Sequence, residues 1–182
     1  MKKISYIQIV LIIFMTNKSF AGNLFKDDFQ DPIQWTFISD SVMGGVSTGS
    51  IVYEMKEGYS VAYMSGDVST KNNGGFIQAR RNLENVDLKK AKYIKIIAKG
   101  NNQKYFLHLR TGGTILPWQY YQISFDVIEN YKEFILPIEK FKKSGSFQPS
   151  KVNSESIKSV AIVAYGRNHK ANIYVKEISF IE

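Results

Sequence analysis

The chain has 182 residues and no cysteine, which excludes a disulfide framework, a thiol nucleophile and a cysteine-based metal site. Its 44% hydrophobic and 22% charged residues are typical of a globular protein, and its length suits one domain with a substantial core. The net charge of +8 comes mostly from scattered lysines, which indicates a solvated surface and argues against a nucleic-acid partner.

The N-terminal segment has the pattern of a signal peptide. A basic start is followed by the apolar stretch Ile7–Met15 and by the small residues of a cleavage site at Ser19–Ala21. The apolar stretch is too short for a membrane-spanning helix, which needs about 20 residues. We therefore expect a signal peptide over residues 1–21, with an uncleaved anchor as the alternative. The remaining residues, 22–182, are expected to form a single secreted or periplasmic domain without a membrane span.

Short strand-like segments fill the rest of the chain. Aromatic residues make up 14% of it, and aromatic and β-branched residues favour strands. Clusters of Gly, Asn, Asp and Ser separate the segments and leave no room for the helices that a parallel sheet needs. The sequence therefore predicts an all-β fold, an antiparallel β-sandwich or barrel. The predicted strands are Ile51–Met55, Ser60–Ser65, Gly75–Arg81, Tyr93–Lys99, Lys104–Arg110, Gln119–Val127, Lys132–Leu136, Ser159–Tyr165 and Ala171–Ile181.

Alternation along three of these strands gathers aromatic and hydrogen-bonding side chains on outward faces. Such a surface suits a sugar or a polar protein surface. An ordinary polar outer face is the alternative interpretation. The side chains concerned are Phe76, Gln78 and Arg80, then Phe106, His108 and Arg110, and finally Trp118, Tyr120 and Gln122.

The stretch Asp40–Ser47 contains two adjacent glycines, which permit a left-handed backbone or close approach of another segment. Its terminal Asp and Ser can bond to neighbouring backbone groups and fix the loop. We expect a structured turn here, with a ligand-binding loop as the alternative. A phosphate-binding loop is excluded because no GK[ST] or GxGxxG pattern follows. The stretch Asn72–Gly75 predicts a tight hairpin turn.

The sequence has no recognisable catalytic signature. Its two histidines, His108 and His169, lie in separate segments without an HExxH pattern, and no GxSxG motif is present. Nothing selects a particular carboxylate pair for glycoside cleavage. Asp27 and Asp28 lack the ligand spacing of a calcium loop and are expected to be solvated. We therefore predict no catalytic site, no bound metal and no cofactor.

Two motifs lie in a recognisable order along the chain: Asp40–Ser47 reads Asp-Ser-Val-Met-Gly-Gly-Val-Ser, and Asn73–Phe76 reads Asn-Gly-Gly-Phe. Weaker matches accompany them at Trp35, Ser65–Ser69, Arg80 or Arg81, Tyr93–Ile96, Lys99–Gly100, Tyr105–Arg110, Pro117–Tyr120, Leu136–Pro137 and Phe141. Together they resemble the complex I intermediate-associated protein 30 family.

The resemblance implies a jelly-roll β-sandwich related to galactose-binding domains. Mitochondrial members are assembly factors for respiratory complex I that act by binding proteins and not by catalysis. We therefore expect a noncatalytic protein-binding or assembly module with a protein partner. A carbohydrate-binding module is the alternative, and a hydrolase acting on glycans is the second alternative. The expected binding residues are Asp40, Met43, Gly44, Gly45, Ser47, Asn73, Gly74, Gly75, Arg110, Trp118 and Tyr120.

Overall fold

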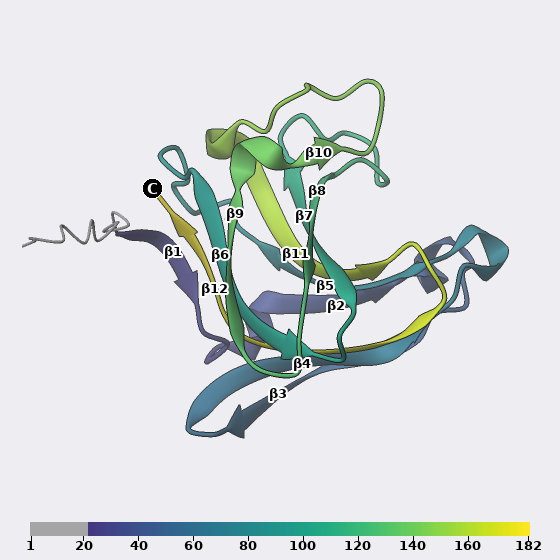
Figure 1. Ribbon diagram of the computed structural model, residues 1–182. Helices are drawn as coiled ribbons and strands as arrows, with labels where there is room; N and C mark the ends of the chain where they lie inside the picture. The colour runs from purple at the N-terminus through teal and green to yellow at the C-terminus, as the bar shows by residue number, and fades with distance from the viewer. Residues whose placement is uncertain (1–21) are drawn as a thin grey trace, which may run out of the picture.

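The computed structural model describes residues 22–182, so the predicted signal peptide lies outside the described residues. These residues form twelve strands and several short 3-10 turns, with no α-helix among them. The strands pair into two antiparallel sheets that pack face to face as a β-sandwich (Figure 1). No helix within residues 22–182 is long and apolar enough to cross a membrane.

The first sheet has the order β3-β4-β12-β6-β9, and β1 pairs with β12 beside this path. The second sheet has the order β10-β8-β7-β11-β5-β2. The chain passes repeatedly from one sheet to the other, as in a jelly roll. The strands of the first sheet are β1 (Asn23–Asp27), β3 (Thr48–Lys56), β4 (Tyr59–Val68), β6 (Tyr93–Gly100), β9 (Lys132–Pro137) and β12 (His169–Ile181). Those of the second are β2 (Trp35–Ser39), β5 (Phe76–Asn82), β7 (Lys104–Thr111), β8 (Tyr121–Asp126), β10 (Lys142–Lys143) and β11 (Ile157–Tyr165).

The core lies between the two sheets and consists of the inward-facing half of each strand. Ile94, Ile96 and Ala98 of β6 and Leu107 and Leu109 of β7 are each 0% exposed. Burying a large apolar side chain of this kind stabilises the fold by about 1.5–3 kcal/mol. The period-2 alternation that predicted the strands therefore arises from this shared core.

All nine predicted strands are present, with ends shifted by three residues at most. Three further strands, β1, β2 and the two-residue β10, were not among those predicted. In β2 only the first residue, Trp35, is buried, so this edge strand carries no alternating apolar pattern.

The prediction of a hairpin turn at Asn72–Gly75 is wrong. β4 pairs with β3 and β12 in the first sheet, whereas β5 pairs with β11 and β2 in the second, so this turn connects the sheets. The backbone of this turn is left-handed at three positions, with φ of 56° at Asn72, 57° at Asn73 and 130° at Gly75. Asn and Gly serve any sharp change of direction, so their presence does not distinguish a hairpin from a crossing between sheets.

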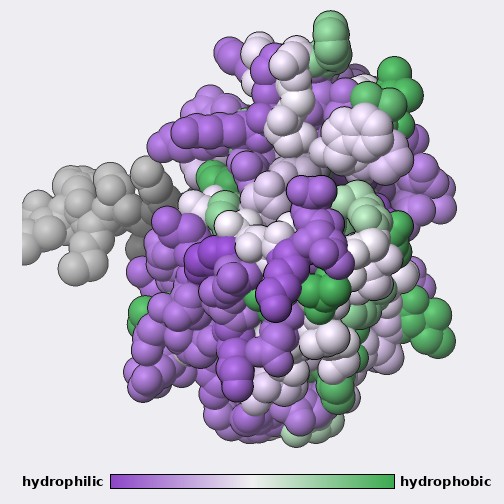
Figure 2. Space-filling view, turned by 90° about the vertical axis from the view of Figure 1, so that its right-hand side faces the viewer, coloured by the Kyte–Doolittle hydropathy of each residue, from purple (hydrophilic) through white to green (hydrophobic). Residues whose placement is uncertain are grey.

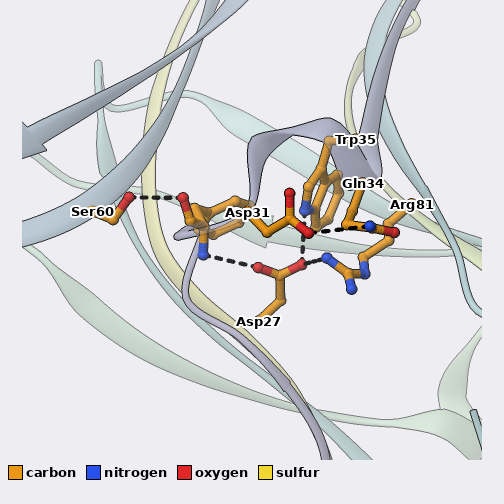
Figure 3. Close-up of polar contacts among 7 residues, drawn as sticks. Asp27, Asp31, Gln34, Trp35, Ser60 and Arg81 are labelled. Carbon is orange, nitrogen blue, oxygen red and sulfur yellow. Dashed lines mark hydrogen bonds and ion pairs between the residues drawn. The ribbon is translucent and has the colours of Figure 1, made fainter.

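Asp27, at the end of β1, ties the two sheets together. It is only 6% exposed. Its Oδ1 accepts a hydrogen bond from the backbone N–H of Phe29 at 2.8 Å, and its Oδ2 accepts one from Trp35 Nε1 at 2.8 Å (Figure 3). Oδ2 also pairs with the guanidinium of Arg81. The expectation of a solvated carboxylate is therefore wrong for Asp27, because β2 and β5 of the second sheet supply its partners.

Replacing Asp27 by Asn should lower the free energy of unfolding by about 3 kcal/mol, because the partly buried Arg81 loses its anionic partner. Urea denaturation measures this change. Asp31→Asn is the matched control, since Asp31 is exposed and accepts a hydrogen bond from the exposed Gln34 (Figure 3). It should change stability by less than about 0.5 kcal/mol. Equal losses in the two variants would contradict the sheet-linking role of Asp27.

Candidate functional site

A groove of about 720 Å³ runs over the outer face of the second sheet, which is within the size range of small-ligand sites. The loop that contains Val42 and Met43 closes one end, and the loop that contains Pro117 and Trp118 lines another part. Figure 2 shows the side of the molecule that lies to the right in Figure 1, where hydrophobic and near-neutral side chains lie beside hydrophilic ones. The molecule therefore presents a mixed surface on this side.

Small and medium side chains of β11 form the floor of this groove. Ala161 pairs with Arg80 of β5 on one side and with His108 of β7 on the other. Neighbouring strands lie about 4.8 Å apart, so the backbones of Arg80 and His108 are about 10 Å apart across the methyl group of Ala161. One row further along the sheet, Val163 pairs with Gln78. Ala161 is the smallest side chain in this row, and its neighbours leave it only 2% exposed.

An uncharged aromatic wall lines one side of the groove. The ring of His108 stacks on Tyr120, with centroids 4.0 Å apart and planes 7° apart. Tyr165 packs edge-on against both rings at 5.8 and 6.3 Å. Burial lowers the pKa of His108 to about 3, against a smaller opposing effect of Gln122, and burial raises the pKa of Tyr120. Both rings are therefore neutral at pH 7, and the buried Nε2 of His108 has no hydrogen-bond partner among residues 22–182.

Arg110 holds the loop that presents Trp118. Its Nη1 donates to the carbonyl of Pro117 at 2.6 Å, and its Nη2 donates to those of Thr114 and Leu116 at 3.2 Å each. Trp118 lies in this loop, before β8 begins, and is 61% exposed on the groove side. Arg110 therefore positions the loop, while the indole of Trp118 is free to meet a ligand.

Asp40 organises the opposite end of the groove. It is 0% exposed. Its Oδ1 accepts a hydrogen bond from the Ser47 N–H at 2.9 Å, and its Oδ2 accepts from Ser47 Oγ at 2.5 Å, Gly75 N at 2.5 Å and Phe76 N at 3.3 Å. Burial raises the pKa of Asp40, but the hydrogen bonds from Ser47, Gly75 and Phe76 together hold it below its usual value. The carboxylate therefore joins the turn after β2 to the first residues of β5.

The glycines around Asp40 are required by its carboxylate. A Cβ added at Gly45 or at Gly74 would overlap the Asp40 side chain. Gly44 has a left-handed φ of 84°. Close packing at Gly45 and Gly74, together with the left-handed backbone at Gly44, shapes the two loops, and Met43 and Asn73 line the groove.

The eleven predicted binding residues fall into two groups. Met43, Asn73, Gly74, Arg110, Trp118 and Tyr120 line the groove. Asp40, Gly44, Gly45, Ser47 and Gly75 lie behind it and hold the loops.

The predicted set omitted groove residues on β5, β7 and β11. The alternation of inward and outward side chains along the predicted strands already placed Gln78, Arg80 and His108 on the outward side. These three groove residues could therefore have been found from the sequence. Ala161 and Val163 carry no such signal, because β11 is apolar on both faces and alternation does not separate its groove face from its core face.

Within the part of the chain that the structure describes, no three His, Asp or Glu side chains gather closely enough to hold a metal ion. The groove thus offers aromatic, amide and guanidinium groups for binding.

Residues 23–173 match the pattern that defines the family described as complex I intermediate-associated protein 30. The chain belongs to this family. The resemblance carried by the Asp40–Ser47 and Asn73–Phe76 motifs is thereby confirmed. Because the match covers every strand from β1 to β11, the two motifs joined by Asp40 lie inside the complex I intermediate-associated protein 30 domain.

Solved structures with the same fold include carbohydrate-binding modules. The family 11 module of a cellulosomal cellulase of Clostridium thermocellum aligns with a TM-score of 0.73 and 18% identity, over 88% of this chain and 95% of that one. The Clostridium thermocellum family 11 module in complex with a β-1,3-1,4-mixed-linked tetrasaccharide aligns with a TM-score of 0.70 and 17% identity, over 85% and 92%. An exo-β-agarase aligns with a TM-score of 0.58 and 8% identity, over 87% of this chain but 25% of that one.

At these identities the similarity shows the fold alone, and it confirms the predicted jelly-roll β-sandwich. Comparison with curated proteins gave no significant match.

The lowered pKa of Asp40 predicts a pH dependence of stability. A carboxylate whose pKa in the folded state lies below its unfolded value of 3.8 stabilises the fold above that pH, and this contribution is lost as the pH falls through the folded pKa. We expect Asp40→Asn to be less stable by about 2 kcal/mol at pH 7 and to lose less stability than the wild type below about pH 4. Urea denaturation between pH 2 and pH 7 tests this, and equal acid slopes would contradict it.

Gly74→Ala should lower the free energy of unfolding by about 1–3 kcal/mol, because the added methyl group meets the Asp40 carboxylate. Gly112→Ala is the control, since a Cβ there meets nothing within 4 Å. The loss should be smaller when Gly74→Ala is introduced into Asp40→Ala, because the two positions are in contact. Thermal denaturation of the four variants measures the coupling, and additive losses would argue against it.

Proposed function

We propose that this chain is a noncatalytic glycan-binding module whose binding site is the groove on the second sheet. The observation that supports this most is the stacked His108–Tyr120 pair in a groove that also contains the exposed Trp118. A pyranose ring has apolar C–H faces, which stack on aromatic rings, and hydroxyls at its edge, which accept and donate hydrogen bonds. Gln78 and Arg80 stand on the other side of the Ala161–Val163 floor and present amide and guanidinium groups to such hydroxyls.

The charge of the groove supports binding without hydrolysis. No Asp or Glu of residues 22–182 lines it. Glycoside hydrolysis commonly needs two carboxyl groups, about 5–9.5 Å apart, on either side of the scissile bond. The jelly-roll fold shared with the Clostridium thermocellum family 11 modules, one of them in complex with a tetrasaccharide, also supports a carbohydrate ligand.

A protein-binding or assembly module is the second candidate. Membership of the complex I intermediate-associated protein 30 family favours it, as does the exposed apolar rim of the groove. There Val42 is 71% exposed, Met43 56% and Trp118 61%. Side chains of this kind suit an apolar polypeptide segment. Because residues 1–21 have the pattern of a signal peptide, we propose that either function operates in the periplasm or outside the cell.

Trp118→Ala should weaken glycan binding about tenfold or more, because an exposed indole in the groove contributes binding free energy by contacting the ligand. Its free energy of unfolding should change by less than about 0.5 kcal/mol. Isothermal titration calorimetry measures binding to soluble oligosaccharides, namely mixed-linked glucan, agarose and polygalacturonate tetrasaccharides. Tyr59→Ala is the matched control, since Tyr59 is 56% exposed but belongs to the first sheet.

Two outcomes would contradict this proposal. One is that no neutral or acidic oligosaccharide binds. The other is that Tyr59→Ala weakens binding as much as Trp118→Ala. A single protein that is captured from the native envelope by the wild type, but not by Trp118→Ala, would favour the second candidate.

A further inference from the structure

Arg80 is a cation without a protein partner. Among the four arginines of residues 22–182, Arg81 pairs with Asp27, Arg110 donates to three carbonyls, and Arg167 bonds to Gln103 and to the carbonyl of Lys104. Arg80 makes neither a hydrogen bond nor an ion pair with any described residue, although it is partly buried in the groove. Arg80 is therefore the one arginine of residues 22–182 whose N–H donors bond to no described residue.

The surroundings of Arg80 contain no compensating negative charge. The lining includes no carboxylate, and its second cation is Arg110. Burial lowers the pKa of Arg80, and the charge of Arg110 lowers it further. A guanidinium nevertheless stays protonated at physiological pH because its intrinsic pKa is so high. An anion in the groove would relieve both the desolvation of Arg80 and its repulsion by Arg110.

The other polar groups of the groove are neutral. His108 is uncharged near pH 7 because burial lowers its pKa to about 3. Gln78 lies two residues before Arg80 on the same face of β5, about 6.8 Å away along the strand. A ligand lying along β11 would therefore meet the guanidinium of Arg80, which has no protein partner, and the amide of Gln78, which accepts and donates hydrogen bonds. The guanidinium of Arg110 also lines the groove, but it already donates to three backbone carbonyls.

We propose that the groove selects acidic glycans, with Arg80 pairing to the carboxylate of a hexuronate or to a sulfate ester on the sugar. This inference rests on the glycan-binding function proposed above. The five N–H donors of a guanidinium match the two oxygens of such a group, and charge-assisted bonds of this type are about twice as strong as neutral ones. The sugar ring carrying the anion would lie in the groove beside the partly exposed side chains of Arg80 and Tyr120.

The test compares tetragalacturonate with its fully methyl-esterified form, which keeps the rings and linkages but removes the charges. We expect the wild type to bind the acid about tenfold or more tightly than the ester, and the difference to shrink as NaCl is added. Arg80→Gln should abolish the preference, and Arg80→Lys should retain part of it, because Lys keeps the charge without the fork. Lys140→Gln is the control for net charge, since Lys140 is exposed and outside the groove lining.

A second arm of the test compares a sulfated galactan tetrasaccharide with its desulfated form. If the preference that depends on Arg80 appears in the galacturonate arm, the anion is a carboxylate; if it appears in the galactan arm, the anion is a sulfate ester. Circular dichroism and thermal melting verify that each variant is folded. Equal binding of acidic and neutral forms in both arms, or equal weakening by Lys140→Gln and Arg80→Gln, would overturn the selectivity while leaving glycan binding intact. Absence of binding to every sugar, neutral or acidic, would overturn the glycan-binding function as well.

Discussion

The buried carboxylate of Asp40 is the interaction on which one end of the groove depends. Removed from water, it must be met by hydrogen-bond donors, and Ser47, Gly75 and Phe76 supply them. Those donors come from segments that lie 7 to 36 residues further along the chain. Since no side chain fits between the carboxylate and the backbone at Gly45 or Gly74, the two glycine motifs form a single packed unit.

The same division of roles recurs at the other loop that lines the groove. Asp40 stays buried while Met43 reaches the surface, and Arg110 is held by backbone carbonyls while Trp118 is exposed. In both loops a charged side chain satisfies the backbone, and a neighbouring apolar side chain is left uncovered. The motifs Asp40–Ser47 and Asn73–Phe76 thus contain residues of both kinds. Asp40, Ser47 and Gly75 hold the loops, whereas Met43 and Asn73 line the groove.

The difference between local and long-range interactions explains which features of the fold and of the groove the sequence predicts. Alternation predicted nine strands and the outward direction of Gln78, Arg80 and His108, because burial of one face is a local property of a strand. It did not predict which strands pair, so the turn at Asn72–Gly75 was assigned to a hairpin. It also missed the partners of Asp27, because Arg81 follows 54 residues later on a strand of the other sheet. Ala161 gave no signal, since its importance lies in its small size between two longer neighbours.

In the proposed function, this outer row of side chains selects the ligand. The fold does not, because carbohydrate-binding modules and part of an agarase share it. Along β11, Ala161 faces the groove while Ile162 faces the core, and the same alternation separates Arg80 from Ala79 on β5. Substitutions on the groove face therefore leave the core packing intact. The register of the sheet fixes Arg80 and His108 on either side of Ala161. A substitution of Arg80 therefore alters the charge of the groove, one of His108 alters the stacked aromatic pair, and one of Ala161 alters the depth. Substitutions on this face can in this way change the chemistry of the groove without altering the packing between the two sheets.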